Sequence, residues 1–421
     1  MTRELQLDVA RRRRRRLWLL RLAVLAPLLI GQEVVCRFLF PLPEVIGFNR
    51  IRYQRLAPGD ARSRAILARG LAYDRLKFES RPDGFSEVHR LNLYGFRGAD
   101  FTIEPLPGRR RILSLGDSVV EGQGASEEEV IPSVLARLLG KDGIEADVIN
   151  LGVVAASLTE LTVLARDSVA LLKPTDVILV LYANDLPAAP YPRAFDSPAP
   201  SFRRRRGLSP RLLELFVRVA SNQSIYRRWP PQSAIPFFLP VPDSANPWTG
   251  VDDAPAGLNR SLFEAMRAGQ LNPWLWEQSK AIPGMLSHDF SRGDGSPAPY
   301  LARISALCRA QNAHLVVAYV PFCGVTNTRY SDSLVKMGME RSNAEALDSD
   351  PIYRRQNEIV ASVCKELDLP LADTTEALCQ AEAEGTQQYW SFDTHPRPEG
   401  CATIAGEIYR VWRGSQPSET R

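Results

Sequence analysis

The stretch ILSLGDSVVEGQG, from Ile112 to Gly124, ends an apolar run on Gly-Asp-Ser. Gly, Asp and Ser are common turn residues, so Ser118 could simply close a loop. It could instead be a nucleophile held at the rim of a sheet. A serine hydroxyl is a poor nucleophile, so this second interpretation requires a base, an acid that orients the base, and donors for an oxyanion. Residues of these types do occur later in the chain.

Strand-like and helix-like segments alternate from Arg110 onwards. The pattern predicts buried strands over 110–116, 146–153, 176–185, 314–321 and the start of 370–378. It predicts helices between and after them, over 126–140, 157–174, 299–313, 352–369 and 398–412. Ser126 with Glu129, and Ser157 with Glu160, have the spacing of a capping box at the start of the first two helices.

This alternation is typical of an α/β fold in which helices cover both faces of a mostly parallel sheet. In such sheets the functional site lies at the carboxyl ends of the strands. Ser118, Gly152 and Asn184 end or follow the first three predicted strands, and Asp393 and His395 lie in the loop before the last helix. One edge of the sheet would therefore gather all five residues.

The N-terminal segment predicts attachment to a membrane. Six arginines, Arg11 to Arg16, precede an apolar stretch, and 17–40 is long enough to span a bilayer if Arg21 extends towards the headgroups. The arginines indicate a cytoplasmic N-terminus and a translocated body. A cleaved signal peptide is the alternative, but Pro27 follows the best cleavage position. An interfacial helix is disfavoured because the apolar residues do not keep to one face.

Composition narrows the remaining possibilities. The formal charge of +4 owes its sign to two arginine blocks, 11–16 and 203–206, and no basic face with interleaved aromatics suggests a nucleic-acid partner. The six cysteines form no C-x-x-C pair and the four histidines are scattered, which argues against a structural zinc site. One or two disulfides would be compatible with an extracytoplasmic body, and buried thiols are the other possibility.

Residues 187–300 interrupt the alternation. They hold more than half of the chain's 32 prolines and four of its seven tryptophans, and only 209–229 looks helical within them. We interpret the segment as a large insertion that could form a cap or lid; a partly disordered loop is the alternative. The connector 41–109 contains LNLYGFRGADF (91–101), which we expect to pack on the following domain.

Taken together, the motifs resemble the SGNH/GDSL hydrolase superfamily. GDSVVEGQG, NLGV, AND and DTHP match its four blocks in family order. The resemblance covers about 90–186 and 300–413, and implies a flavodoxin-like three-layer α/β/α sandwich. It assigns Ser118 as nucleophile, His395 as base and Asp393 as the third triad member. It also assigns the backbone N–H groups of Ser118 and Gly152, with the Asn184 amide, as oxyanion donors.

Two positions depart from the family pattern. The third block usually begins with glycine, where this chain has Tyr182. The last block is usually Asp-x-x-His, but here Phe392 stands at the aspartate position and Asp393 precedes His395 by only two residues. An Asp-x-His spacing also resembles that of superfamily members that acetylate exopolysaccharides. Asp117 and Asp185 are expected to hold loops, and His89, His288 and His314 to be structural.

The resemblance leads to a primary hypothesis and two alternatives. The primary one is a membrane-anchored, extracytoplasmic serine esterase that cleaves an O-acyl ester on a glycan or lipid, with no cofactor and no metal, periplasmic if the source is bacterial. The first alternative is an O-acyltransferase acting on an exopolysaccharide or cell-wall glycan. The second is a catalytically inactive glycan-binding or scaffold protein of the same fold. The acyl group, the alcohol and the oligomeric state stay open.

A division of the chain accompanies these hypotheses. We expect a basic cytoplasmic tail (1–16), a spanning segment (17–40), a connector (41–109), a hydrolase-like domain (110–413) that includes the insertion, and a short C-terminal tail (414–421).

Overall fold

The structure is a computed structural model of the 421-residue chain. It describes residues 3–39, 75–79, 84–154, 156–186, 246–268, 271 and 275–416, with short segments at 45–46, 196, 203–204 and 235–236. The chain divides into two compact units. One comprises Met1–Ile46 and Arg203–Trp229, and the other comprises Gly47–Phe202 and Pro230–Arg421.

The first unit contains one long helix, α1 (Arg3–Leu39), and a short antiparallel pair, β1 (Val45–Ile46) with β7 (Arg203–Arg204). The part of α1 from Arg13 to Phe38 is long and apolar enough to cross a membrane, as the sequence predicts, although a signal sequence near the N-terminus has the same properties. Its apolar side chains are exposed. Two charges within it pair with each other, since Arg37 Nε lies 2.8 Å from Glu33 Oε1.

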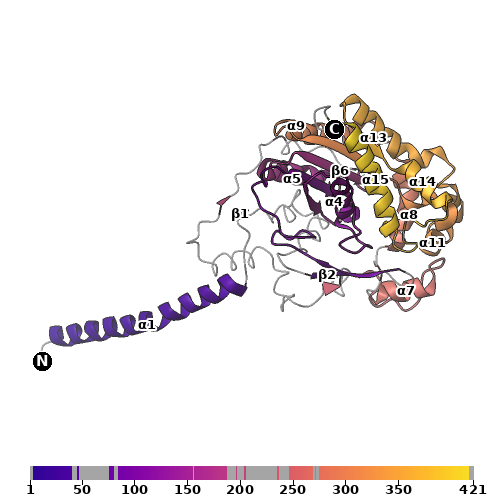
Figure 1. Ribbon diagram of the computed structural model, residues 1–421. Helices are drawn as coiled ribbons and strands as arrows, with labels where there is room; N and C mark the ends of the chain where they lie inside the picture. The colour runs from indigo at the N-terminus through magenta and orange to yellow at the C-terminus, as the bar shows by residue number, and fades with distance from the viewer. Residues whose placement is uncertain are drawn as a thin grey trace. The chain divides into compact units, whose positions relative to one another are not determined.

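The second unit is built on a five-stranded parallel sheet with strand order β10-β9-β6-β4-β5. Figure 1 labels β6, the middle strand of this sheet. The strands are β4 (Arg110–Gly116), β5 (Ala146–Gly152), β6 (Asp176–Tyr182), β9 (His314–Val320) and β10 (Leu371–Asp373). β4 and β6 are buried almost throughout, which explains why the sequence reads as continuous apolar runs there rather than as alternation. All five strands fall where the sequence predicts them.

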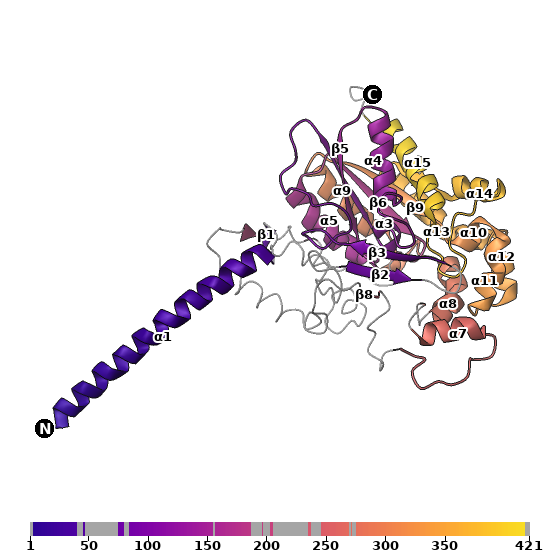
Figure 2. The ribbon, with the colours of Figure 1, turned by 60° about the horizontal axis from the view of Figure 1, so that its bottom comes forward.

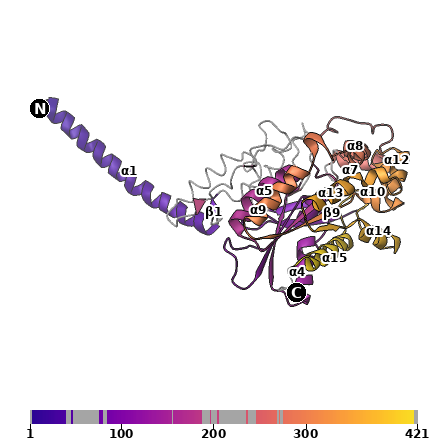
Figure 3. The ribbon, with the colours of Figure 1, turned by 90° about the horizontal axis from the view of Figure 1, so that it is seen from above.

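Helices cover both faces of the sheet. α4 (Ile131–Lys141) and α15 (Pro398–Gly414) pack together on one face, and α5 (Leu158–Leu172) and α9 (Ala298–Arg309) on the other (Figure 3). α13 (Arg355–Glu366) packs against α9, β9 and β10. The three-layer α/β/α arrangement that the sequence predicts is therefore present.

Among the described residues, six further helices lie beyond β9, on the side of the sheet away from β5 (Figure 2). They are α7 (Arg260–Arg267), α8 (Leu275–Ser287), α10 (Cys323–Thr326), α11 (Ser331–Lys336), α12 (Arg341–Ala346) and α14 (Thr375–Ala383), with 3₁₀ turns at Gly293–Gly295, Thr328–Tyr330 and Pro351–Arg354. α7 and α8 belong to the predicted insertion, and their apolar faces, including Trp276, join the main core together with Trp248, which precedes α7. The helix expected over 209–229 lies outside the described residues.

A second, small sheet combines two strands that precede β4 in the chain with one that follows β6. β2 (Arg75–Glu79) pairs antiparallel with β3 (Ser86–Arg90) and parallel with β8 (Ile235–Pro236). The segment after β3 packs on the main unit, as expected for 91–101, with Leu91, Tyr94 and Phe96 buried. This part of the predicted connector is therefore part of the folded body.

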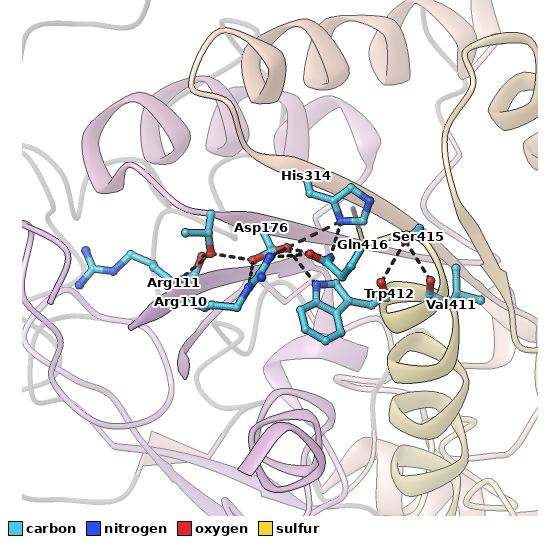
Figure 4. A network of polar contacts seen from close by, with 9 residues as sticks. Arg110, Arg111, Asp176, His314, Val411, Trp412, Ser415 and Gln416 are labelled. Carbon is cyan, nitrogen blue, oxygen red and sulfur yellow. Dashed lines mark hydrogen bonds and ion pairs between the residues drawn. The ribbon is translucent and has the colours of Figure 1, made fainter. Parts of the chain in front are cut away.

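A buried polar network ties the C-terminal helix to the amino ends of the strands (Figure 4). The Asp176 carboxylate accepts hydrogen bonds from Arg110 at 2.9 and 3.1 Å and from Trp412 Nε1 at 2.9 Å, and His314 and Gln416 lie beside it. Burial alone would raise the pKa of Asp176. The contacts with His314, Arg110 and Thr175 outweigh burial and lower that pKa to about 2.

The structure corrects one local expectation and decides two others. The first predicted helix begins at Ile131 rather than after Ser126, because the Ser126–Glu129 pair closes a turn ahead of the helix and Pro132 occupies its first turn. The second capping box is confirmed, with the Glu160 carboxylate accepting the Ser157 N–H at 2.8 Å. The six cysteines are free thiols and four of them are buried, so the structure favours buried thiols over disulfides; the four are Cys308, Cys323, Cys364 and Cys401.

Candidate active site

Ser118 follows the carboxyl end of β4, which lies between β5 and β6 in the sheet, and is the first residue of the short helix α3 (Ser118–Glu121). Asp117 caps this helix, and its Oδ1 accepts the Val119 N–H at 2.8 Å. Gly116 has no room for a side chain, because a Cβ there would lie 2.3 Å from Val120 Cγ2. The strand therefore turns directly into the helix and leaves the Ser118 hydroxyl at the sheet edge.

His395 lies against Ser118 although 277 residues separate them. Its Nε2 is 2.8 Å from Ser118 Oγ, and its Nδ1 contacts Asp393 Oδ1. A carboxylate only accepts, so the proton belongs on Nδ1 and leaves Nε2 free to accept the serine proton. Burial lowers the pKa of His395, but the carboxylates of Asp393 and Asp117 outweigh it and raise that pKa above 6.5.

The two-residue spacing between Asp393 and His395 is accommodated by an uncommon backbone conformation. Thr394 between them has φ +69°, in the left-handed region that a β-branched residue rarely adopts. Backbone hydrogen bonds hold the turn: Thr394 N–H donates to Trp390 O, and Trp390 N–H donates to His395 O, both at 2.9 Å. The sequence left it open whether this shorter spacing lets the carboxylate reach the imidazole; in the structure it does.

Gly152 ends β5 directly beneath α3. A Cβ at this position would lie 2.1 Å from Glu121 N and 2.5 Å from Glu121 Cα, so only glycine allows the close approach. Its N–H, the predicted oxyanion donor, is not free, because it donates to Asn150 Oδ1 at 2.8 Å. The Asn150 amide also donates to Val120 O at 3.0 Å and so links β5 to α3.

Asn184 lies in the turn after β6, on the same edge of the sheet. Its side chain is exposed and makes no hydrogen bond to the described residues. Asp185 holds this turn, since its Oδ2 accepts the Tyr182 N–H at 2.9 Å and its carbonyl accepts the Leu158 N–H at 2.8 Å. The expectation that Asp117 and Asp185 hold loops matches these contacts.

Arg97, from the segment before β4, supports the nucleophile helix, and the sequence analysis did not identify it. Its side chain is 3% exposed, and its guanidinium donates to the carbonyls of Glu121, Gly122 and Ala125 at 3.2, 2.5 and 2.7 Å. These carbonyls end α3 and form the following turn, in which Gly122 has φ +93°. Arg97 thus supplies these carbonyls with the hydrogen bonds that a further turn of the helix would otherwise provide.

Further side chains that the sequence analysis missed surround the triad. Gln123 Nε2 is 3.4 Å from both carboxylate oxygens of Asp393. Trp390 Nε1 donates to Gly124 O at 2.9 Å and so connects the histidine loop to the serine loop. These contacts join segments that are about 270 residues apart in the chain.

The other histidines lie outside this constellation. His89 is fully buried and its Nδ1 is 2.7 Å from Glu121 Oε1. Burial lowers the pKa of His89 by more than the Glu121 carboxylate raises it. His314 belongs to the Asp176 network, and His288 packs edge-on against Phe290. Among the described residues there is no group of three or more His, Cys, Asp or Glu side chains that could hold a metal ion.

Comparison with known proteins identifies the class. Residues 114–402 match the GDSL-like lipase/acylhydrolase family, which is more than half of the chain, and the chain belongs to this family. The protein is therefore a hydrolase of ester bonds, and its resemblance to the SGNH/GDSL superfamily is confirmed. No curated protein matches the sequence.

Several solved structures are similar to the chain. One is TesA, with 10% sequence identity and a TM-score of 0.36; the match covers 72% of this chain and 99% of TesA. Another is a lipase/acylhydrolase from Enterococcus faecalis, with 12% identity and a TM-score of 0.34; the match covers 72% of this chain and 96% of that protein. A third is a catalytic mutant of the acetylxylan esterase Axe2 from Geobacillus stearothermophilus, with 12% identity and a TM-score of 0.35; the match covers 72% of this chain and 93% of that protein.

Proposed function

We propose that the protein is a membrane-anchored serine esterase that hydrolyses an O-acyl ester through an acyl-Ser118 intermediate. The observation that carries this proposal is the position of the His395 imidazole, 2.8 Å from Ser118 Oγ on one nitrogen and in contact with Asp393 on the other. This geometry argues against an inactive scaffold, because a structural role would not require a base aimed at the serine hydroxyl.

The chemistry follows from these contacts. Ser118 Oγ attacks the ester carbonyl carbon while its proton passes to His395 Nε2, and Asp393 stabilises the imidazolium. The imidazolium then protonates the departing alcohol oxygen, which leaves the acyl group on Ser118. Water attacks the acyl carbon in the second half-reaction, again giving its proton to His395, and the acid is released as Ser118 regains its hydrogen.

The tetrahedral oxyanion requires donors that are already in place. We assign the Ser118 N–H and the Asn184 side-chain amide to this role, because both lie at the carboxyl ends of adjacent strands. The Gly152 N–H would join them only if Asn150 Oδ1 released it. Removing one donor of this kind typically lowers turnover by ~10²–10³.

The anchor suggests where the reaction takes place. The arginine block before the apolar part of α1 supports a cytoplasmic N-terminus and an extracytoplasmic hydrolase domain, periplasmic in a bacterium. The substrate would then be an ester on a glycan or lipid within reach of the membrane. In intact cells or spheroplasts, external protease should degrade the hydrolase domain of the membrane-retained protein. Release of a shortened, soluble form would instead identify α1 as a cleaved signal.

Hydrolysis of p-nitrophenyl acetate, butyrate and octanoate by the full chain in detergent tests the catalytic assignment. Ser118→Ala and His395→Ala should abolish turnover, and Ser118→Ala should also abolish labelling by a fluorophosphonate. Ser114→Ala is the matched control, since Ser114 is buried in β4, the strand that precedes Ser118, with no hydrogen bond from its hydroxyl to the described residues. Turnover that persists in Ser118→Ala would refute the proposal.

The transferase alternative is tested in the same experiment. A sugar acceptor is added, and both released acid and acylated sugar are measured. Acylated sugar formed at the expense of acid would reassign the second half-reaction from water to a sugar hydroxyl, with the same acyl-Ser118 intermediate.

A further inference from the structure

The two departures from the family motifs meet in space. Tyr182, which replaces the usual glycine of the third block, ends β6, and the Asp-Thr-His turn precedes α15. In the sequence they are 212 residues apart, yet Tyr182 Oη donates to the Thr394 carbonyl at 3.1 Å. This carbonyl belongs to the residue between Asp393 and His395, and a glycine at 182 would have no hydroxyl to offer it.

The Asp-Thr-His turn needs an external contact of this kind. With only one residue between the acid and the base, the chain passes through the left-handed conformation at Thr394, which disfavours a β-branched side chain. Such a conformation persists only where surrounding contacts impose it. The two backbone hydrogen bonds to Trp390 hold the turn from within its own loop, whereas the Tyr182 hydroxyl connects the turn to β6.

Tyr182 is suited to this task because it is fixed and neutral. Its side chain is 5% exposed and belongs to the main core, and β6 pairs with β4 on one side and β9 on the other. Burial raises its pKa well above the ordinary value, so the hydroxyl keeps the proton that it donates.

We infer that Tyr182 is a positioning residue that sets the Asp393–His395 pair against Ser118 by holding the Thr394 carbonyl. Tyr182 and the shortened Asp-Thr-His motif act together to position the histidine. The two-residue spacing brings the carboxylate to the imidazole only in a strained turn, and the tyrosine hydroxyl keeps that turn in register with the strand that precedes Asn184. The inference rests on the proposed Ser118–His395–Asp393 site.

Tyr182→Phe tests the inference in the full-length enzyme, because it removes the hydroxyl and keeps the ring. We expect kcat for p-nitrophenyl acetate to fall about tenfold, with KM within about twofold, because the base is present but less well aligned. The acidic limb of the pH–rate profile should move to lower pH, since Asp393 then raises the pKa of His395 less. An additional Thr394→Gly change should recover part of the lost kcat, since glycine adopts φ +69° without strain.

A double-mutant cycle separates this role from general packing. In an Asp393→Asn background the further Tyr182→Phe change should cost less than about twofold, because the contact it positions is already lost. Tyr300→Phe is the matched control: its hydroxyl is 3.4 Å from Thr159 Oγ1, between α9 and α5, and it should leave kcat and the pH profile unchanged.

Two results would overturn the inference. One is an unchanged kcat and pH profile in Tyr182→Phe, and the other is a full tenfold loss that adds to that of Asp393→Asn. Ser118→Ala, measured alongside, distinguishes a failure of the Tyr182 inference from a failure of the proposed catalytic site. If it abolishes turnover while Tyr182→Phe has no effect, only the role of Tyr182 falls; if it keeps turnover, the proposed catalytic site falls as well.

Discussion

Replacing Gly152 by alanine perturbs the nucleophile without touching any side chain of the triad. The added Cβ would lie 2.1 Å from Glu121 N and 2.5 Å from Glu121 Cα, both backbone atoms of the helix that starts at Ser118. An ordinary contact begins near 3.4 Å, so β5 and α3 must separate by about 1.3 Å. Backbone cannot rotate away as a side chain can, and the displacement is passed to Ser118 three residues earlier.

The size of the effect follows from that displacement. Ser118 Oγ is 2.8 Å from His395 Nε2, and a misplacement of about 1 Å in such a pair lowers turnover by roughly 10²-fold. Overpacking of this kind also lowers the free energy of unfolding by about 1–3 kcal/mol. We therefore expect Gly152→Ala to remain folded, with kcat/KM for p-nitrophenyl acetate about 100-fold below that of the parent.

Initial-rate kinetics and thermal unfolding of the full chain in detergent would test this prediction. Gly406→Ala is the control, because a Cβ there meets nothing within 4 Å and alanine should stabilise α15 by up to about 1 kcal/mol. Gly152→Ala keeps the backbone N–H of residue 152. Any loss of kcat/KM therefore reflects displacement of Ser118 rather than removal of a hydrogen-bond donor. Unchanged kcat/KM and melting temperature would show that the approach of β5 to α3 does not constrain the nucleophile.

Further predictions concern the triad, its support and the network at the opposite end of the sheet. Asp393→Asn should lower kcat by about 10³–10⁴, because the amide no longer imposes the Nδ1–H tautomer on His395; a loss under tenfold in steady-state assays would contradict this. Because the pKa of His395 is raised and the neutral imidazole is the base, kcat/KM should fall with decreasing pH along a limb whose apparent pKa lies above 6.5. Arg97→Met should lower the free energy of unfolding in urea by about 3 kcal/mol and reduce kcat, because three carbonyls at the end of α3 lose a charged donor. The pKa of Asp176 is lowered from 3.8 to about 2, so its contribution of about 2 kcal/mol is present above pH 4 and lost between pH 4 and 2; this acid sensitivity should disappear in Asp176→Asn.

Most of the fold could be predicted because its signals are local. β4, β6 and β9 are buried apolar runs, and helices such as α4 and α13 have an amphipathic repeat. The start of α4 was misplaced because the Ser126–Glu129 pair is compatible with a cap and with an isolated turn. Pro132, which is favoured in the first turn of a helix, and the packing of Val130 and Ile131 into the core set the start of α4 at Ile131.

The candidate site was predictable to a lesser extent, for a physical reason. Residues with a chemical signature could be selected by type and motif. His395 does lie beside Ser118, and Asp393 contacts the other ring nitrogen of His395. Arg97 acts on backbone carbonyls, which have no sequence signature. Asn150 was within reach of sequence reasoning, since an asparagine two residues before an N–H commonly accepts from it.

Tyr182 and the Asp-x-His spacing show why motif departures are better weighed together than singly. Taken alone, a tyrosine in place of glycine suggests altered packing, and a shortened spacing suggests a misplaced acid. In the structure each supplies what the other requires, since the short spacing forces Thr394 into the left-handed region and the tyrosine hydroxyl fixes the carbonyl of that same residue. If the cycle with Asp393→Asn shows the expected coupling, the two departures are one adaptation of the catalytic site, and chains that carry one without the other should position the histidine less well.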